Sequence, residues 1–224
     1  MITRFWAGTR KAGSTRAHFQ RHWAEVHAGF GLALPGLRAY VQNHVDGGPG
    51  TNWATPAFDG CSELSWDDLA AMREAFASRE MRDADRDERE FADPDRFAVF
   101  LGERRVLQGA VGDAGFRVLS FLRANPSGSK QRLAAALEAE YAQVVGGTNA
   151  ACHEIFVAID GADEPLACDV VDSLWFERRE DALRLGDLGV DIGAALAGYA
   201  FGREVALVRS RRMRSIEPRG VVAR

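Results

Sequence analysis

The sequence predicts an α+β fold in which two consecutive β-α-β-β-α-β units close a pseudo-dimeric barrel within one chain. Three observations predict it. Segments that alternate apolar and polar residues, typical of strands, and segments of helical periodicity follow one another in the same order in both halves. Stretches rich in Gly and Pro separate these segments. A Gly-rich link at 108–115 divides the chain, so the predicted units span residues 1–108 and 114–215.

The first predicted strand covers residues 2–7, and the first helix begins at Ser14. The Ser14 hydroxyl can accept a hydrogen bond from a free N–H of the first helical turn. Spacings of three and four residues give this helix one apolar face, formed by Phe19, Trp23, Val26, His27 and Phe30. Pro35 and Gly36 then turn the chain toward the next strand.

The second predicted strand starts at Leu37 and has two different rows of side chains, because successive residues of a strand point to opposite faces. The mainly apolar row is Leu37, Ala39, Val41, Asn43 and Val45. The polar row, which includes an aromatic ring, is Arg38, Tyr40, Gln42 and His44. We expect the apolar row to pack under helices and the polar row to line the barrel cavity.

Residues 46–56 are dense in Gly and Pro and form a predicted loop, whose Trp53 is either a lid over a cavity or a plug on a partner surface. The first half is completed by a strand at 58–66, a helix from Asp67 or Asp68 to Ser78, a charged helix at 80–91 that Pro94 ends, and a strand at 97–106. The second half is predicted to contain strands at 116–123, 152–159, 169–177 and 203–212, and helices at 125–145 and 179–198.

Each half is therefore a ferredoxin-like unit. Such a unit covers one face of its sheet with helices and leaves the other face bare, so the bare face must be buried against another sheet. Because both units belong to one chain, we expect the two bare faces to meet within it. This arrangement also leaves room for a homodimer of the whole chain.

Composition and charge exclude several classes of function. The chain has 224 residues, 46% hydrophobic and 27% charged, with a net charge of −4, as in an ordinary globular protein. No basic patch dominates, so we expect no nucleic-acid partner. No apolar run is long enough to span a membrane. Three isolated cysteines (Cys61, Cys152 and Cys168) and the lack of a signal-peptide pattern indicate a cytoplasmic location.

Two stretches resemble a known family. The first combines F-x-x-H-W-x-x-x-H, which carries Phe19, His22, Trp23 and His27, with P-G-L-R-A-Y-V-Q-N-H. The second is F-D-G-C-S-E-L-S-W-D-D-L, which starts at Phe58. Together they resemble the EthD family, a branch of the dimeric α/β-barrel superfamily, over the first half of the chain. The resemblance implies the ferredoxin-like fold and the face-to-face pairing of two such units into a barrel. It leaves the reaction open, because the chemistry of the family is largely unassigned.

His27 and Tyr40 are the candidate catalytic pair. An imidazole beside an apolar surface can act as a general base, and a tyrosine hydroxyl can donate a hydrogen bond to a developing enolate or phenolate oxygen. The resemblance implies the same pair, since a methylmuconolactone isomerase of this superfamily branch is thought to use a His and a Tyr at the matching positions. The alternative role of His27 is structural, either at its helix end or on a core carbonyl.

Further residues are expected to bind the substrate or to hold the site together. The candidate substrate-binding residues are His44, Gln42, Trp6, Trp66 and Glu63. Glu63 could pair with His44 or act as a second acid, or else be exposed. The residues expected to have structural roles are His22, Trp23 and Asn43. We expect no metal site, because the pair His18 and His22 lacks a completing ligand.

We expect no cofactor, because the sequence contains no nucleotide- or flavin-binding motif. Three functions remain open. The chain could be a cofactor-independent isomerase, lyase or cyclase that acts on a small apolar oxygenated or aromatic compound. It could be a cofactor-free monooxygenase or other oxidoreductase, or a protein that only binds small molecules. The first helix of the second half has no His-Trp pair, so we expect one pocket per chain, in the first half.

Overall fold

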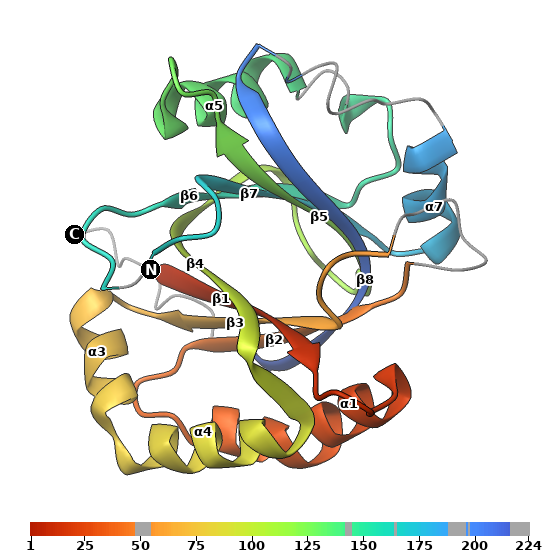
Figure 1. Cartoon of the computed structure of the whole chain (residues 1–224). Helices are drawn as coiled ribbons and strands as arrows, with labels where there is room; N and C mark the ends of the chain where they lie inside the picture. The colour runs from red at the N-terminus through yellow and green to blue at the C-terminus, as the bar shows by residue number, and fades with distance from the viewer. Residues whose placement is uncertain (48–54, 142–144, 164, 188–195, 197, 216–224) are drawn as a thin grey trace, which may run out of the picture.

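Eight strands in the described part of the chain close an antiparallel barrel in the order β1-β3-β2-β8-β5-β7-β6-β4 (Figure 1). This computed structural model describes residues 1–47, 55–141, 145–163, 165–187, 196 and 198–215. The strands are β1 (Ile2–Arg10), β2 (Ala39–Val45), β3 (Gly60–Trp66), β4 (Ala92–Gly109), β5 (Phe116–Ala124), β6 (Cys152–Ala158), β7 (Val170–Phe176) and β8 (Ala200–Ser215).

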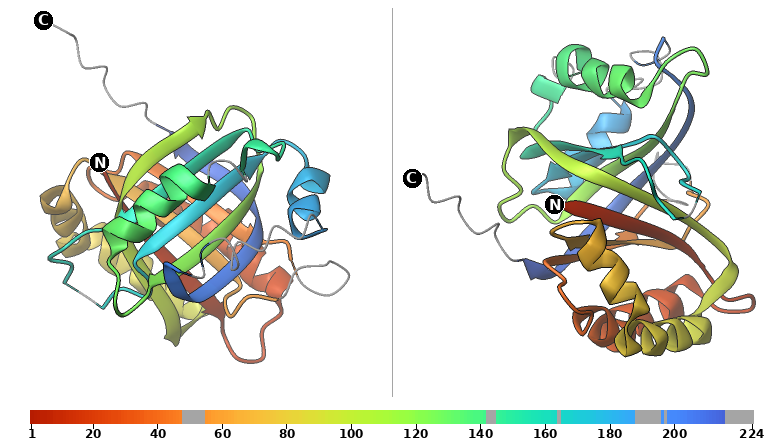
Figure 2. Two further views of the ribbon diagram at one scale, coloured as in Figure 1. Left: turned by 90° about the horizontal axis from the view of Figure 1, so that it is seen from above. Right: turned by 90° about the vertical axis from the view of Figure 1, so that its left-hand side faces the viewer.

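Two groups of helices cover opposite outer sides of the barrel (Figure 1 and Figure 2). The first group is α1 (Arg16–His22), the π-helical turn η1 (Trp23–His27), α2 (Ala28–Leu32), α3 (Leu69–Ala77) and α4 (Arg79–Phe91). The second group is α5 (Lys130–Ala136), the π-helical turn η2 (Leu137–Tyr141) and α7 (Arg179–Asp187). The predicted continuation of the last helix beyond Asp187 lies largely outside the described residues, and the prediction for Trp53 lies entirely outside them.

Side-chain caps fix where the helices begin. Thr15 caps α1, because its hydroxyl accepts a hydrogen bond from the His18 N–H at 3.1 Å. The prediction that Ser14 is the cap was therefore wrong by one residue, since two adjacent hydroxyls both suit the position. Asp68 caps α3 by accepting from the Ala71 N–H at 2.8 Å, in agreement with one of the two residues predicted there.

Each half contributes a four-stranded antiparallel sheet to the barrel. The strand order is β4-β1-β3-β2 in the first half and β8-β5-β7-β6 in the second. The sheets are joined where β2 pairs with β8 and where β4 pairs with β6. The predicted pseudo-dimeric α/β barrel of two ferredoxin-like units is confirmed. The domain limits 1–108 and 114–215 stay a prediction.

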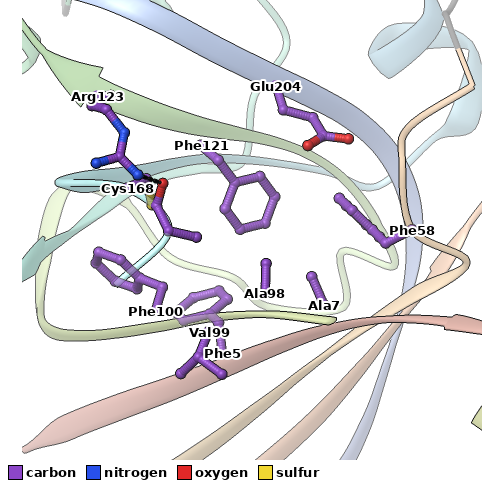
Figure 3. A pocket seen from close by; sticks show the side chains of 11 residues that line it. Phe5, Ala7, Phe58, Ala98, Val99, Phe100, Phe121, Arg123, Cys168 and Glu204 are labelled. Carbon is purple, nitrogen blue, oxygen red and sulfur yellow. Dashed lines mark hydrogen bonds between the residues drawn. The ribbon is translucent and has the colours of Figure 1, made fainter. Parts of the chain in front are cut away.

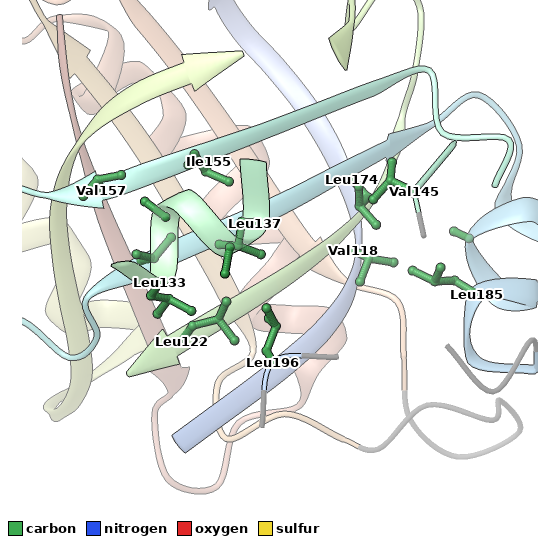
Figure 4. Packing of buried hydrophobic residues seen from close by; sticks show 14 of the residues in the cluster. Val118, Leu122, Leu133, Leu137, Val145, Ile155, Val157, Leu174, Leu185 and Leu196 are labelled. Atoms are coloured by element: carbon green, nitrogen blue, oxygen red, sulfur yellow. The ribbon is translucent and has the colours of Figure 1, made fainter. Parts of the chain in front are cut away.

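Apolar side chains fill three layers. One cluster lies between the second helix group and its sheet and includes Leu133 and Leu174 (Figure 4). The matching layer under the first helix group includes Trp23 and Phe91. A third cluster, which includes Phe5, fills part of the barrel interior. Both faces of the barrel strands are therefore buried.

The two rows of β2 face the opposite way from the prediction. The polar row lies under the first helix group: the Gln42 amide donates to the Trp23 carbonyl at 2.9 Å, and the His44 and Trp23 ring centroids are 4.8 Å apart. The row that contains Asn43 and Val45 faces the barrel interior. The prediction was wrong because both faces of the strand are buried, so side-chain polarity does not mark the face that helices cover.

Candidate functional site

His27 and Tyr40 line one small cavity between the first helix group and the sheet. His27 comes from η1 and Tyr40 from β2, and the walls also include Trp6, Ser62 and Glu88. The cavity volume is about 40 Å³, which is room for about one water molecule. The sequence predicts these residues in a pocket inside the barrel. The structure instead places them outside the barrel interior, between the helices and the sheet.

Gly31 allows α2 to lie directly on the Tyr40 ring. A Cβ atom at Gly31 would meet Tyr40 Cε1 at 2.7 Å, which is closer than side chains tolerate. Tyr40 is consequently 2% exposed. Burial raises the pKa of Tyr40 to about 12, so its side chain is a protonated phenol at neutral pH and can donate a hydrogen bond.

The Gln42 amide fixes the position of the Tyr40 hydroxyl. Gln42 Nε2 donates to Tyr40 Oη at 2.7 Å and to the Trp23 carbonyl at 2.9 Å. Gln42 Oε1 lies 3.3 Å from His44 Nε2, and an amide oxygen can only accept, so His44 is the donor. Tyr40 Oη thus accepts a hydrogen bond from Gln42 and keeps its own O–H for another acceptor.

Asp87 of α4 orients the His27 ring. Asp87 Oδ2 lies 2.8 Å from His27 Nδ1, and the carboxylate oxygens lie 3.2 and 3.3 Å from His22 Nε2. In the tautomer with the proton on Nδ1, His27 donates to Asp87 and keeps Nε2 as an acceptor. Burial lowers the pKa of His27, against the opposing effect of Asp87. The ring is therefore neutral at pH 7 and able to take up a proton.

Glu88 is a second ionisable group at this cavity. Burial, aided by a neighbouring aspartate, raises the pKa of Glu88 to about 7, so a large fraction of its side chains carries a proton at neutral pH. Neither Asp87 nor Glu88 was predicted from the sequence, because alternating charges indicate an exposed helix. A signal was present in the spacing, since the buried residues Ala84 and Phe91 lie three and four positions from Asp87 on one helix face.

The π-helical turn η1 carries His27 at its last position. Such turns are rare and are frequent at functional sites. The corresponding helix of the second half contains η2, whose sequence L-E-A-E-Y has no histidine. The π-helical turn therefore belongs to the shared fold, and only the first half uses it to place an imidazole against the sheet.

The remaining candidate binding residues are divided among three places. Trp6 lines the cavity with His27. Trp66 lies elsewhere in the layer between helices and sheet, where its Nε1 donates to a backbone carbonyl of the turn before β2 at 3.1 Å. Glu63 faces the barrel interior and pairs with Arg117 of the second half, and not with His44.

His22 and Asn43 make the contacts of packing residues. The His22 ring stacks on Phe91 with centroids 4.9 Å apart. Asn43 Nδ2 donates to Glu63 Oε1 at 2.5 Å, and Asn43 Oδ1 accepts from Ser210 Oγ at 2.6 Å. Within the described ranges, no three or more His, Cys, Asp or Glu side chains are grouped in a way that could hold a metal ion.

A buried charge cluster crosses the barrel interior. Arg117 of β5 is 0% exposed, contacts Glu63 of the first half through Nη1, and donates from Nη2 to Glu154 Oε1 at 2.9 Å. Arg104 of β4 reaches Glu154 Oε2 at 2.6 Å. Burial alone would raise the pKa of Glu154, but Arg117 and Arg104 hold it below its usual value. The cluster therefore pairs two cations with two carboxylates across both halves.

The helix-facing surface of the second sheet carries Ser120, His153 and Asp172. These positions are equivalent to those that line the cavity in the first half. The pair Trp6 and Ser62 on β1 and β3 corresponds to the pair Ser120 and Asp172 on β5 and β7. His153 Nε2 lies 2.7 Å from Asp172 Oδ1, and both residues are at most 1% exposed. The second half thus has a buried imidazole–carboxylate pair on its sheet.

Solved structures share this architecture across nearly the whole chain. An anthrone oxidase-like protein has a TM-score of 0.68 at 10% identity, and the match covers 95% of this chain and 93% of that chain. A protein from Lactobacillus acidophilus NCFM assigned to the monooxygenases has a TM-score of 0.57 at 13% identity, covering 95% and 93%. A mutant chlorite dismutase from Candidatus Nitrospira defluvii has a TM-score of 0.54 at 9% identity, covering 95% and 92%. At such identities, the likeness shows the fold alone.

No curated protein matches the sequence. Across the described residues, no helix is both long and apolar enough to cross a membrane. The family model of the EthD domain matches residues 11–95, the segment that contains the first helix group together with His27, Tyr40, Asp87 and Glu88. The predicted resemblance to the EthD family is therefore confirmed for residues 11–95.

Proposed function

We propose that this protein is a cofactor-independent enzyme of the isomerase, lyase or cyclase type, which moves a proton on a small apolar oxygenated or aromatic compound. The observation that carries the proposal is that His27 and Tyr40 line the same cavity. Asp87 orients the His27 ring and Gln42 orients the Tyr40 hydroxyl. A base and a hydrogen-bond donor at one cavity suffice to form and stabilise an enolate.

In the proposed step, His27 Nε2 takes a proton from a carbon next to a substrate carbonyl. The electrons of the broken C–H bond form a C=C bond, and the carbonyl π electrons move to the oxygen, to which Tyr40 donates a hydrogen bond. Asp87 stabilises the imidazolium that forms. The proton returns to a different carbon from His27, or from the protonated form of Glu88, so the product is an isomer of the substrate.

A ring-sized substrate needs more room than the cavity offers. Pockets for small molecules are typically about 300–1,000 Å³, whereas this cavity has about 40 Å³. Met81, Ala84 and Glu88 of α4 form one wall, and the rest of α4 is largely charged and exposed. We therefore infer that α4 moves away from the sheet when the substrate binds.

A cofactor-free monooxygenase is the second candidate. The aromatic walls Trp6 and Trp23 of the same cavity favour it, and the similar folds of an anthrone oxidase-like protein and of a protein assigned to the monooxygenases agree with it. The two candidates differ in their need for oxygen. Substrate-dependent oxygen uptake in the absence of metal and flavin would select the monooxygenase.

The test measures exchange of hydrogen for deuterium at the α-carbon of 2-cyclohexenone and of an unsaturated five-membered lactone, by proton NMR in D₂O. We expect His27→Ala to slow the protein-catalysed exchange by about 10²–10⁴-fold, as for loss of a general base. We expect Tyr40→Phe to slow it by about 10²–10³-fold, as for loss of an oxyanion donor. His18→Ala is the matched control, because His18 is exposed on the same helix. Equal exchange by the wild type and His27→Ala would contradict the proposal.

A further inference from the structure

A larger cavity lies inside the barrel, where the two sheets meet. Its volume is about 250 Å³, compared with about 40 Å³ beside His27. Both halves of the chain line it, with Phe5 and Phe100 from the first and Phe121 and Cys168 from the second (Figure 3). Among the described residues, this cavity and the proposed enzyme site share no lining side chain.

Four phenylalanine rings form much of the cavity wall. The rings of Phe5 and Phe100 have centroids 5.6 Å apart and lie at 72° to each other. The rings of Phe58 and Phe121 have centroids 5.7 Å apart and lie at 80°. Nearly perpendicular rings present both an edge and a face to a ligand. Edge-to-face contacts of this kind are favourable between aromatic rings. The wall therefore suits a planar aromatic compound.

The inner wall carries no charge among the residues described for it. Cys168 is 4% exposed, and burial raises the pKa of its thiol, so the sulfur is neutral. Arg123 and Glu204 lie above the aromatic rings in Figure 3. Arg123 donates to the backbone carbonyls just before Cys168, and Glu204 Oε1 accepts from the Ala57 N–H at 2.6 Å. A charged ligand group among the phenylalanines would lose its hydration without a partner.

We propose that this barrel cavity binds a neutral aromatic compound of one or two rings, with a hydroxyl group directed toward Arg123 and Glu204. An apolar cavity of about 150 Å³ holds benzene, so the space of about 250 Å³ fits two fused rings. The rim carries the Arg123 guanidinium, which can donate a hydrogen bond to a ligand hydroxyl. It also carries the Glu204 carboxylate, which can accept one from a ligand hydroxyl. This site does not depend on the function proposed for His27 and Tyr40.

The experiment titrates the full-length protein with 1-naphthol and follows naphthol fluorescence. Ala98 is exposed and lines the cavity, so Ala98→Phe should obstruct the opening without disturbing the core. We expect wild-type binding to saturate and Ala98→Phe to weaken it by an order of magnitude or more. Val106→Phe is the matched control, because Val106 is exposed on the same strand outside this lining; we expect its affinity to equal that of the wild type.

Two further variants keep the test decisive if Ala98→Phe folds poorly. Phe121→Leu removes one ring at nearly constant volume, and we expect about a threefold to tenfold loss of affinity. His27→Ala should bind 1-naphthol as the wild type does. Absence of saturable binding, wild-type affinity in both Ala98→Phe and Phe121→Leu, or loss of binding in His27→Ala would overturn the proposal. The last result would place naphthol at the cavity beside His27.

Discussion

The two sheets of the barrel carry different polar groups at the same place under their helices. The first sheet presents Trp6, Tyr40 and Ser62 there, and the second presents Ser120, His153 and Asp172. In the first half, a cavity separates the sheet from His27 on the covering helix. In the second half, the imidazole and the carboxylate both belong to the sheet and contact each other at 2.7 Å.

This difference separates polar residues that contact each other within one sheet from polar residues that face each other across a cavity. The second half joins its imidazole to its carboxylate within one wall, so the pair is suited to holding strands together. The first half takes its imidazole and its carboxylate, His27 and Asp87, from helices and its hydroxyl, Tyr40, from the sheet. Groups that face each other from two walls can act on a molecule placed between them.

The largest expected effect tests whether the second-half pair is structural. Asp172→Ala removes the carboxylate from a buried pair, and breaking such a pair costs about 3–5 kcal/mol. We expect the free energy of unfolding, measured with urea, to fall by that amount. Asp163→Ala is the matched control, because Asp163 pairs with Arg73 at the surface, where a pair contributes about 0–1 kcal/mol. Similar losses in both variants would mean that the buried pair has no special structural role.

The next effect concerns the carboxylate of the first half. Asp87→Asn keeps the side-chain shape but weakens control of the His27 tautomer. We expect the α-proton exchange rate to fall by about 10–100-fold, as for other partners that orient a histidine, with little change in stability. Glu90→Gln is the control, since Glu90 is exposed on the same helix. An exchange rate unchanged in Asp87→Asn would show that the pair His27 and Asp87 is structural, like the pair in the second half.

The third effect is a decrease in the free energy of unfolding at acidic pH, which we attribute to His44 of the first half. Burial, with Arg211 and Arg209 nearby, lowers the pKa of His44 from 6.5 to about 4. Below pH 6.5 the unfolded chain therefore binds a proton that the folded chain does not, so stability falls as the pH decreases toward 4. We expect a contribution of about 1–2 kcal/mol, reduced by the partial exposure of the ring.

Urea unfolding of His44→Gln at pH 7 and pH 4.5 checks this effect. The variant should lose less stability than the wild type between the two pH values, whereas His18→Gln, at an exposed position, should behave as the wild type. The same pH dependence in all three proteins would show that His44 is not the source.

The smallest effect concerns the hydroxyl of Ser120. Within the described part of the chain, Ser120 Oγ has no hydrogen-bond partner, so Ser120→Ala removes a buried polar group that makes no bond. We expect a stability change of about 0–1 kcal/mol in the stabilising direction. Ser173→Ala is the contrasting variant, because Ser173 Oγ accepts from Arg117 Nε at 2.5 Å, and it should destabilise by about 1–3 kcal/mol. A larger loss from Ser120→Ala than from Ser173→Ala would reverse this interpretation.

The order of strands and helices could be predicted because alternation and helical periodicity are local properties of the sequence. The orientation of β2 could not, since both of its faces are buried and the barrel interior itself holds the polar pair Asn43 and Glu63. The sequence therefore predicted the wrong surroundings for Tyr40 and Gln42. The structure places Tyr40 and His27 at one cavity, and their chemical roles remain proposals.

Long-range partners were the other part that the sequence could not supply. Arg117 lies 54 positions from Glu63 and 37 from Glu154, and nothing in its local sequence indicates that its side chain is buried. Asp87 was missed for a different reason, because its neighbours are charged and only the spacing of Ala84 and Phe91 marks the inner side of α4.

Arg117 also makes the charge balance of the barrel interior depend on both halves, because it contacts Glu63 of the first half and Glu154 of the second. Thr3 of β1 occupies the position in the first half that Arg117 of β5 occupies in the second. The two positions are equivalent because the pair Thr3 and Ser65 corresponds to the pair Arg117 and Trp175. The first half therefore has no arginine at the strand position from which Arg117 contacts Glu63. The second half supplies that cation, so the counter-charge of a carboxylate in one half is encoded in the other.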